Sequence, residues 1–178
     1  MIITLEEGEA LTALFLGTER YSRARSKGIP KRSMGSNDMW KDPLAHDKVG
    51  LYAELALNKY LNTYPMQSLS LQLKTKRSGK DMGDVHYEGI NIDVKATIHD
   101  HGVLWIDKDN PNIDYYCFFV VKEAENKNIQ CDLKGFIKAA TLHEKQPIHR
   151  KQFRFPCKVA EQNELIPLEE AFETNIRH

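Results

Sequence analysis

Residues 91–97, NIDVKAT, place an acid and a base two positions apart, Asp93 and Lys95. On a β-strand, residues i and i+2 point to the same side, so this carboxylate and ammonium project together. Ile92 and Val94 then face the other side, toward the core. A carboxylate can hold a divalent cation, and a neighbouring ammonium can bind a phosphate and polarise a water molecule. The alternative is a solvent-facing ion pair on a half-exposed strand.

A second carboxylate reaches this strand if the preceding segment folds back on it. The sequence DVHYEGINIDVKAT predicts two strands meeting at Glu88-Gly89, which would return Asp84 to the side of Asp93. Clustered carboxylates repel unless a cation joins them. Two Asp oxygens, a backbone carbonyl and water suit Mg²⁺, and we expect Mn²⁺ to substitute. Asp81 is the rival first ligand, and Asp84 is favoured because it abuts the strand.

The elements that position these groups are read from periodicity. Residues 46–61 have an apolar stripe at helical spacing, and Glu54 lies beside it. Upstream, residues 4–26 are expected to be helical, with Thr4 and Glu7 as a capping box. The further expected elements are strands at 68–74, 103–107 and 114–122 (the last buried and central), a helix capped by Asp132 over LKGFIKAATLHEK, a late strand in FRFPCKV and a terminal helix in ELIPLEEAF.

This order predicts an α/β or α+β fold with helices packed on a mixed central β-sheet. A length of 178 residues favours one domain, 1–178. Within it we expect an N-terminal helix and basic loop (1–45), a catalytic core (46–140) and a C-terminal strand and helix (141–178).

Charge is balanced overall, with 25 basic and 25 acidic residues, but it is segregated along the chain. Basic runs occupy 20–32, 74–80 and 149–158, while acids gather near the C-terminus. This pattern favours a face for a polyanion, with solvated loops and helix faces as the alternative. The candidate DNA-backbone contacts are Arg20, Arg23, Arg25, Lys27, Lys31 and Arg32.

Other classes of function lack their sequence signals. No apolar run is long enough to span a membrane, and the acidic N-terminus does not predict a signal peptide. Three cysteines without a CxxC pair favour a cytoplasmic location over a disulfide framework or thiolate zinc site. The sequence lacks a Gly-rich phosphate loop, so it does not predict a nucleotide cofactor. It also lacks a G-x-S-x-G motif, so it does not predict a hydrolase triad.

Several other side chains leave their roles open. His99 and His101 could form a metal-ligand pair, line the site or contact phosphate, or belong to a polar turn. Tyr52, Trp40 and Trp105 could stack on bases or pack in the protein.

The segments described above resemble the PD-(D/E)XK nuclease superfamily, which includes many restriction endonucleases. Gly83-Asp84 resembles its first element and IDVKAT its (D/E)XK element. GLYAELALNKYL resembles its G-x-x-x-E-x-x-A-like helix, with Leu57 where Ala is more usual. YYCFFVV and the start of LKGFI resemble its later strand and helix. The resemblance covers residues 49–140, and Gly83 stands where a proline usually precedes the first Asp.

The resemblance implies a restriction-endonuclease-like fold and metal-dependent hydrolysis of DNA, which we expect to be endonucleolytic and to leave a 5′-phosphate. It implies metal ligation by Asp84, Asp93 and the Val94 carbonyl. Lys95 would be the catalytic lysine, and Glu54 would hold a water on the metal or bind a second metal. DNA would be the partner, with a homodimer left open. The alternatives are a catalytically inactive DNA-binding module on this fold, or a non-nuclease α/β protein with a surface Asp–Lys pair.

Overall fold

The computed structural model describes residues 1–26, 45–62, 83–124, 127–150 and 155–173. The described structure contains both helices and strands around a mixed sheet, and the fold is of the mixed α/β class. The elements are β1 (Ile2–Leu5), α1 (Glu7–Ser26), α2 (Ala45–Tyr60), β2 (Val85–Tyr87), β3 (Ile90–Thr97), β4 (Leu104–Ile106), β5 (Tyr115–Glu123), β6 (Ile129–Lys138), α4 (Ala139–His143), β7 (Lys158–Ala160), the 3₁₀ turn η1 (Gln162–Glu164) and α5 (Leu168–Glu173).

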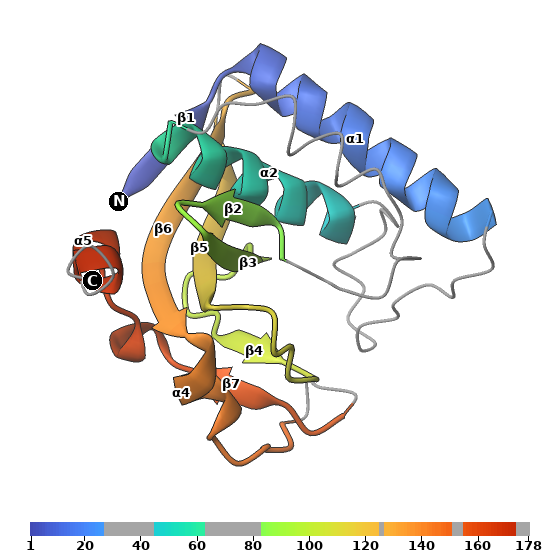
Figure 1. The fold of residues 1–178 in the computed structure, drawn as a ribbon. Coiled ribbons are helices and arrows are strands. Elements are labelled where there is room, and N and C mark those ends of the chain that lie inside the picture. The colour runs from blue at the N-terminus through green and yellow to red at the C-terminus, as the bar shows by residue number, and fades with distance from the viewer. Residues whose placement is uncertain (27–44, 63–82, 125–126, 151–154, 174–178) are drawn as a thin grey trace.

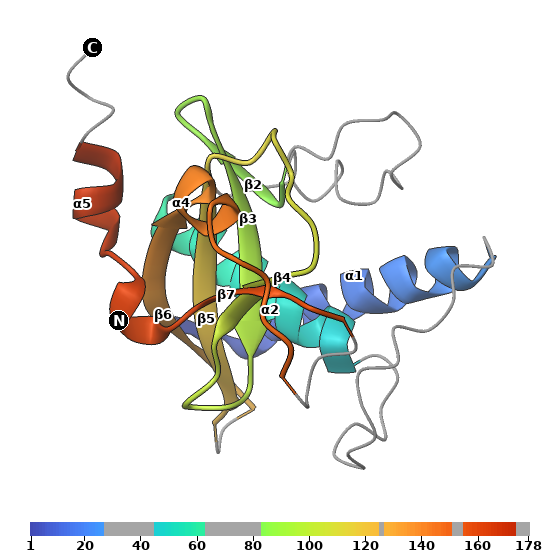
Figure 2. The same cartoon turned by 90° about the horizontal axis from the view of Figure 1, so that it is seen from below.

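A five-stranded sheet forms the centre of the described structure, in the order β1-β6-β5-β3-β2. Only β3 and β5 run parallel, and the other neighbours are antiparallel. The sheet is therefore mixed, as the sequence predicts. Strands β4 and β7 form a separate antiparallel pair. Figures 1 and 2 show the helices α1 and α2 on one side of the main sheet and the β4–β7 pair on the other.

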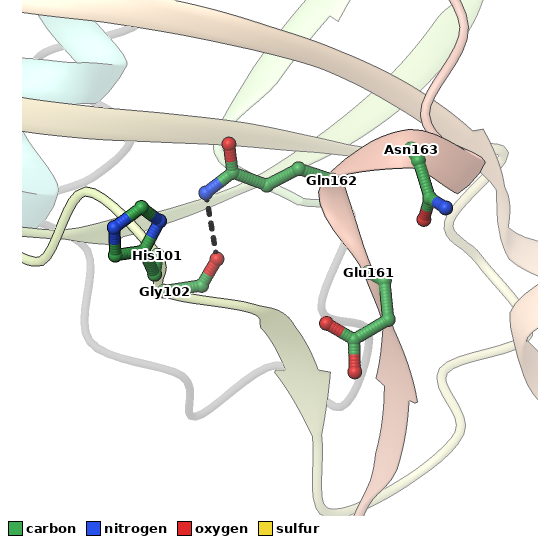
Figure 3. A pocket seen from close by; sticks show the side chains of 5 residues that line it. All are labelled: His101, Gly102, Glu161, Gln162 and Asn163. Carbon is green, nitrogen blue, oxygen red and sulfur yellow. Dashed lines mark hydrogen bonds between the residues drawn. The ribbon is translucent and has the colours of Figure 1, made fainter.

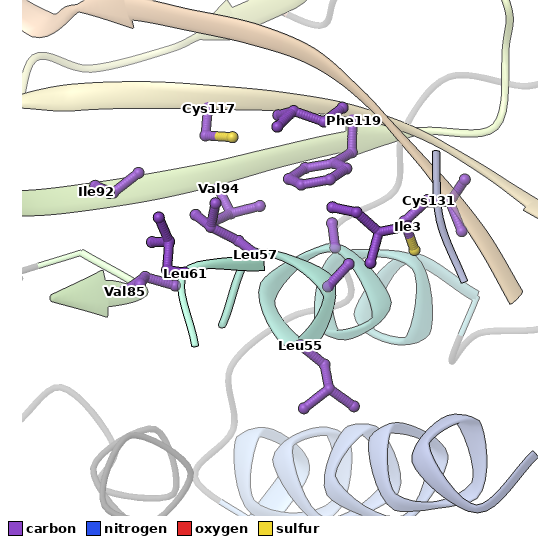
Figure 4. Close-up of a cluster of buried hydrophobic side chains, with 14 of the residues drawn as sticks. Ile3, Leu55, Leu57, Leu61, Val85, Ile92, Val94, Cys117, Phe119 and Cys131 are labelled. Atoms are coloured by element: carbon purple, nitrogen blue, oxygen red, sulfur yellow. The ribbon is translucent and has the colours of Figure 1, made fainter. Parts of the chain in front are cut away.

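The helix α2 packs directly on the sheet, and α1 covers the outer side of α2. In the core between them, Leu57 of α2 meets Val94 of β3, while Leu55 points away from the sheet toward α1 (Figure 4). Both leucines are buried, because this helix is covered on two sides. Apolar burial of this kind contributes about 1.5–3 kcal/mol for each large side chain.

The strand β5 is buried from Tyr115 to Val121, as its continuous apolar run predicts. Its alternate side chains serve two cores. Phe119 packs on the α2 side, whereas Phe118 packs with Leu104 and Leu142 on the side of β4 and α4. A strand covered on both faces is a rigid support for groups on its neighbour β3.

The prediction of a helix that begins at Asp132 is wrong. LKGFI belongs to β6, and the following helix α4 is confined to Ala139–His143. The reason is a period of two, since Ile129, Cys131 and Leu133 are buried and alternate with polar residues. This strand bonds β5 on one edge and β1 on the other. Asp132 caps no helix, and its Oδ2 accepts a hydrogen bond from Lys134 Nζ at 2.6 Å.

The predicted start of the first helix is also wrong. Thr4 lies in β1, which covers the outer edge of β6 with Ile2 opposite Asp132. The helix α1 begins at Glu7, so Thr4 and Glu7 form no capping box. Instead the Glu9 carboxylate accepts the backbone N–H of Glu6 at 2.8 Å, which satisfies one of the unpaired donors at this helix terminus.

The helix near 46–61, the hairpin, the strand in 103–107 and the terminal helix are confirmed within the described residues. The late strand predicted in FRFPCKV begins further along the chain than predicted, because β7 overlaps that segment only at Lys158 and Val159. The strand predicted at 68–74 lies outside the described residues. None of the described helices is long and apolar enough to cross a membrane.

Candidate active site

The hairpin β2–β3 brings Asp84 back to β3. Its two loop residues, Glu88 and Gly89, have φ of 48° and 83°, the positive values that a two-residue hairpin turn requires. Val85 then pairs with Ile92, and the Asp84 N–H donates to the Ile92 carbonyl at 2.8 Å. The turn predicted at this dipeptide therefore fixes which residue of β3 Asp84 meets.

The Asp84 side chain, just before the start of β2, accepts a hydrogen bond from the backbone of β3. Its Oδ2 accepts the backbone N–H of Val94 at 2.8 Å. The N–H and carbonyl of one strand residue point to the same edge, so the Val94 carbonyl also points toward Asp84. Asp84 thus lies beside the Asp93–Lys95 segment, as the sequence predicts. The rival ligand, Asp81, lies outside the described residues.

The backbone conformation at Gly83 explains why this chain has no proline before Asp84. The φ of Gly83 is +86°, and an added Cβ would lie 2.7 Å from the Ile92 carbonyl oxygen and 2.9 Å from Ile113 Cδ1. Proline is fixed near a φ of about −65° and cannot adopt this conformation. The close approach of Gly83 to β3 sets the position of Asp84, so glycine here is a geometric requirement of this hairpin.

Asp93 and Lys95 lie on one face of β3, opposite the buried Ile92 and Val94. The Lys95 Nζ forms an ion pair with Asp93 Oδ2, and the two side chains are 36% and 14% exposed. That oxygen is itself buried, and the Lys95 ammonium is its partner. The pair is therefore more enclosed than a typical surface ion pair.

Glu54 joins this environment from the middle of α2. It is only 6% exposed, although it is a charged residue. Burial raises the pKa of Asp84 well above its usual value, and the negative charges of Glu54 and Asp93 raise it further. The Lys95 ammonium and the Val94 N–H lower it in part. Two further carboxylates and one ammonium thus act on the buried Asp84, and a perturbed carboxyl group of this kind is common at functional sites.

The donor chemistry of this site fits a hard divalent cation. It offers the carboxylate oxygens of Asp84 and Asp93, the Val94 carbonyl, and excess negative charge around Asp84. These are the ligands that Mg²⁺ prefers. In the part of the chain that the structure describes, however, no three His, Cys, Asp or Glu side chains surround one point closely enough to hold a metal.

A second Asp-x-Lys pair, Asp132 and Lys134 on β6, shows what a structural pair looks like. Its Lys134 Nζ lies 2.6 Å from Asp132 Oδ2, with exposures of 25% and 32%. Burial raises the pKa of Asp132, but hydrogen bonds and charge attraction from Lys134 and the Met1 amine outweigh it and leave the pKa lowered. The carboxylate beside Asp93, in contrast, has its pKa raised by neighbouring acids. The sequence pattern is the same, but the surroundings differ.

The two histidines after β3 lie in an exposed turn before β4. His101 lines an open pocket of about 280 Å³ together with Gly102 and residues of η1, including Gln162 (Figure 3). The Gln162 side chain donates to the Gly102 carbonyl at 2.8 Å and ties η1 to this turn. Glu54, Asp84, Asp93 and Lys95 do not line this pocket.

The aromatic and basic candidates have different outcomes. Tyr52 is half-buried against the main core, and Trp105 packs on a small cluster with Val159. Trp40 lies outside the described residues, as do Lys27, Lys31 and Arg32. The backbones of Arg20, Arg23 and Arg25 belong to the C-terminal part of α1.

The structure places beside the site one residue, Tyr116, that the sequence did not predict there. Tyr116 sits in the apolar run of β5, directly beside Asp93 in the parallel pairing of β3 and β5. Its ring lies near the Lys95 ammonium, 5.9 Å from Nζ to the ring centroid. An aromatic residue inside an apolar run is normally assigned to the core, so only the register between strands could identify it.

Comparison with known proteins adds no relative from which a role could be transferred. No protein-family model, no curated protein and no solved structure matches the chain. The function must be inferred from the residues and geometry of the site.

Proposed function

We propose that this chain is a metal-dependent deoxyribonuclease of the PD-(D/E)XK type, with a restriction-endonuclease-like core that cuts within DNA strands. The observation that carries the proposal is the hairpin contact of the Asp84 carboxylate with the Val94 N–H, beside the Asp93–Lys95 pair. It brings the Asp84 carboxylate to the strand that carries Asp93 and Lys95, in the order that the superfamily pattern requires.

The buried Glu54 supports the same proposal. A carboxylate is costly to bury, and Glu54 is only 6% exposed. Its charge acts on Asp84, which links the helix motif to the hairpin motif. The strand β6 departs from the resemblance, because a strand follows β5 where a helix was expected.

In the proposed reaction, Asp84, Asp93 and the Val94 carbonyl would hold Mg²⁺ or Mn²⁺, with Glu54 as a further ligand or water-binding group. When bound, the cation supplies Lewis-acid stabilisation of the charge that develops on the phosphate. Lys95 binds a phosphate oxygen and orients the attacking water. The water oxygen forms a bond to phosphorus, the bond to the 3′ oxygen breaks, and the products are a 5′-phosphate and a 3′-hydroxyl.

The test is cleavage of supercoiled plasmid in Mg²⁺ or Mn²⁺. We expect the unchanged protein to nick or linearise the plasmid, and Asp93→Ala and Lys95→Ala to lower the rate by roughly 10²-fold or more, since each removes a group that stabilises the transition state. The matched controls are Asp132→Ala and Lys134→Ala, which break an Asp-x-Lys pair of similar geometry away from the hairpin.

The outcomes separate the alternatives. Cleavage that persists in both Asp93→Ala and Lys95→Ala would rule out these residues as the site. Binding without cleavage on supercoiled, linear, nicked and branched DNA would favour the inactive DNA-binding module. Neither binding nor cleavage on any of these substrates would favour the non-nuclease protein with an Asp–Lys pair.

A further inference from the structure

Tyr116 lies where it can act on Lys95. It is the register partner of Asp93 in the parallel pairing of β3 and β5, so the two side chains stand next to each other on one face of the sheet. The Lys95 side chain reaches Asp93, which brings its Nζ to 5.9 Å from the Tyr116 ring centroid. This is within the range at which an ammonium is attracted to the face of an aromatic ring.

The Tyr116 ring is held from its other end. Its hydroxyl is 3.0 Å from His143 Nε2, and the two rings meet edge to face, with centroids 5.8 Å apart. Tyr116 is only 2% exposed, in the core shared with Leu142. A tyrosine packed in this way has little freedom to rotate, because both its ring and its hydroxyl have partners.

His143 is in turn tied to the β4–β7 layer. It is the last residue of α4, and its backbone carbonyl accepts a hydrogen bond from Lys158 Nζ of β7. Lys158 also contacts the Asp109 carboxylate at 2.7 and 2.9 Å. A continuous set of contacts therefore runs from the outer layer through His143 and Tyr116 to the ammonium of Lys95.

We propose that Tyr116 is a positioning residue for Lys95, and that His143 fixes the orientation of its ring. This inference rests on the proposed nuclease function. That function assigns Asp93 to a cation, so Lys95 needs a second contact to hold its ammonium at the phosphate. A lysine side chain has large rotational freedom, about 2 kcal/mol in rotamer entropy, and a fixed aromatic wall reduces it.

The first test is kinetic. Tyr116→Phe keeps the ring and removes the hydroxyl, whereas Tyr116→Leu removes the ring. We expect kcat to fall roughly tenfold in Tyr116→Leu, which corresponds to about 1.4 kcal/mol. KM should stay nearly constant, and Tyr116→Phe should recover most of the rate. The matched control is Phe119→Leu, which truncates a fully buried aromatic residue on the opposite face of the same strand.

The second test reads Lys95 directly and needs no activity. In protein labelled with ¹³C-lysine, the Cε–Hε signal of Lys95 is identified by its loss in Lys95→Arg. The ring current of Tyr116 should displace this signal from the position of an exposed lysine. The displacement should remain in Tyr116→Phe and disappear in Tyr116→Leu. If Tyr116→Leu does not fold, His143→Leu replaces it. In that variant we expect the ring-current displacement of the Lys95 signal to decrease but not to disappear.

A Lys95 signal that is unchanged in the variant without the ring would overturn the contact. A lost displacement with kcat equal to that of Phe119→Leu would overturn the positioning role. Absence of cleavage by the unchanged protein would count against the proposed function alone, because the NMR signal still reports the contact between the ammonium and the ring.

Discussion

At the scale of residues, Asp84 is the group whose ionisation the fold opposes most clearly. Burial and the acids Glu54 and Asp93 raise its pKa, and only Lys95 and the Val94 N–H favour its charged form. A pKa raised by folding means that the protonated form is the more stable in the native state. The corresponding stability is present at pH values below the ordinary aspartate value and is lost as the pH rises through the raised value.

The prediction that follows is that Asp84→Asn stabilises the metal-free protein at neutral pH. The amide oxygen can still accept the Val94 N–H, while the repelling charge is gone. We expect the free energy of unfolding to rise near pH 7 and this gain to shrink as the pH falls toward the ordinary aspartate value, since the raised pKa of Asp84 costs stability only where the unfolded chain is ionised. Urea unfolding in chelator at several pH values measures it.

Asp132→Asn is the control, because its effect on stability at neutral pH should be opposite to that of Asp84→Asn. The pKa of Asp132 is lowered, so its charge stabilises the fold above the ordinary aspartate value and ceases to do so in acid. This variant should lose stability at neutral pH and approach the unchanged protein in acid. Equal responses of the two variants would contradict the difference in environment between Asp84 and Asp132.

At the scale of elements, the β2–β3 hairpin depends on two glycines that do different work. Gly83 and Gly89 have nearly equal φ values, 86° and 83°, so both favour glycine over residues with a Cβ. Open space surrounds Gly89, whereas Gly83 lies against the Ile92 carbonyl and the Ile113 side chain. Only Gly83 is next to Asp84, so the hairpin offers a comparison within one element.

We predict that Gly89→Ala lowers the free energy of unfolding by about 1–2 kcal/mol and leaves the cleavage rate of the folded protein nearly unchanged, since only backbone strain is added. Gly83→Ala should be more destabilising and should also lower the cleavage rate of the folded fraction, because the Cβ must displace the segment that carries Asp84. Chemical denaturation and plasmid cleavage measure the two effects. Equal loss of activity in both variants would contradict the role given to Gly83.

At the scale of the whole molecule, the candidate site draws on two layers: Glu54 comes from α2, whereas Asp93 and Lys95 lie on the face of β3 that is turned away from α2. A cation held there binds the folded chain only, because the unfolded chain does not bring these residues together. Binding of this kind stabilises the fold by RT ln(1 + [L]/Kd), or about 2.7 kcal/mol when the free ligand is at 100 times its Kd.

We therefore predict that Mn²⁺ or Mg²⁺ raises the melting temperature of the unchanged protein in a saturable manner. The increase should be much smaller in Asp93→Asn, which removes one carboxylate charge, and should persist in Asp132→Asn. Thermal unfolding with increasing metal concentration, in the absence of DNA, measures it. A metal effect that is equal in all three proteins would place the cation elsewhere.

Local patterns in the sequence determined much of the fold. The alternation in NIDVKAT and the Glu88-Gly89 dipeptide determine the hairpin, because side-chain period and turn conformation are local properties. The apolar run of β5 likewise predicts a central strand. LKGFI is a strand rather than the predicted helix because Ile129 and Cys131, which precede it, establish a period of two that continues at Leu133. Its pairing with β1 and β5 then decides its conformation.

The site divides in the same way. The sequence by itself determined that Asp93 and Lys95 share a strand face and that a hairpin returns Asp84 to them. Only the tertiary structure distinguished the surroundings of this Asp-x-Lys pair from those of Asp132 and Lys134, because the burial of the neighbouring Asp84 and the charges that act on it come from residues far apart in the chain. Only the register of β3 on β5 placed Tyr116 beside Asp93, since pairing between distant strands is set by packing of the whole sheet.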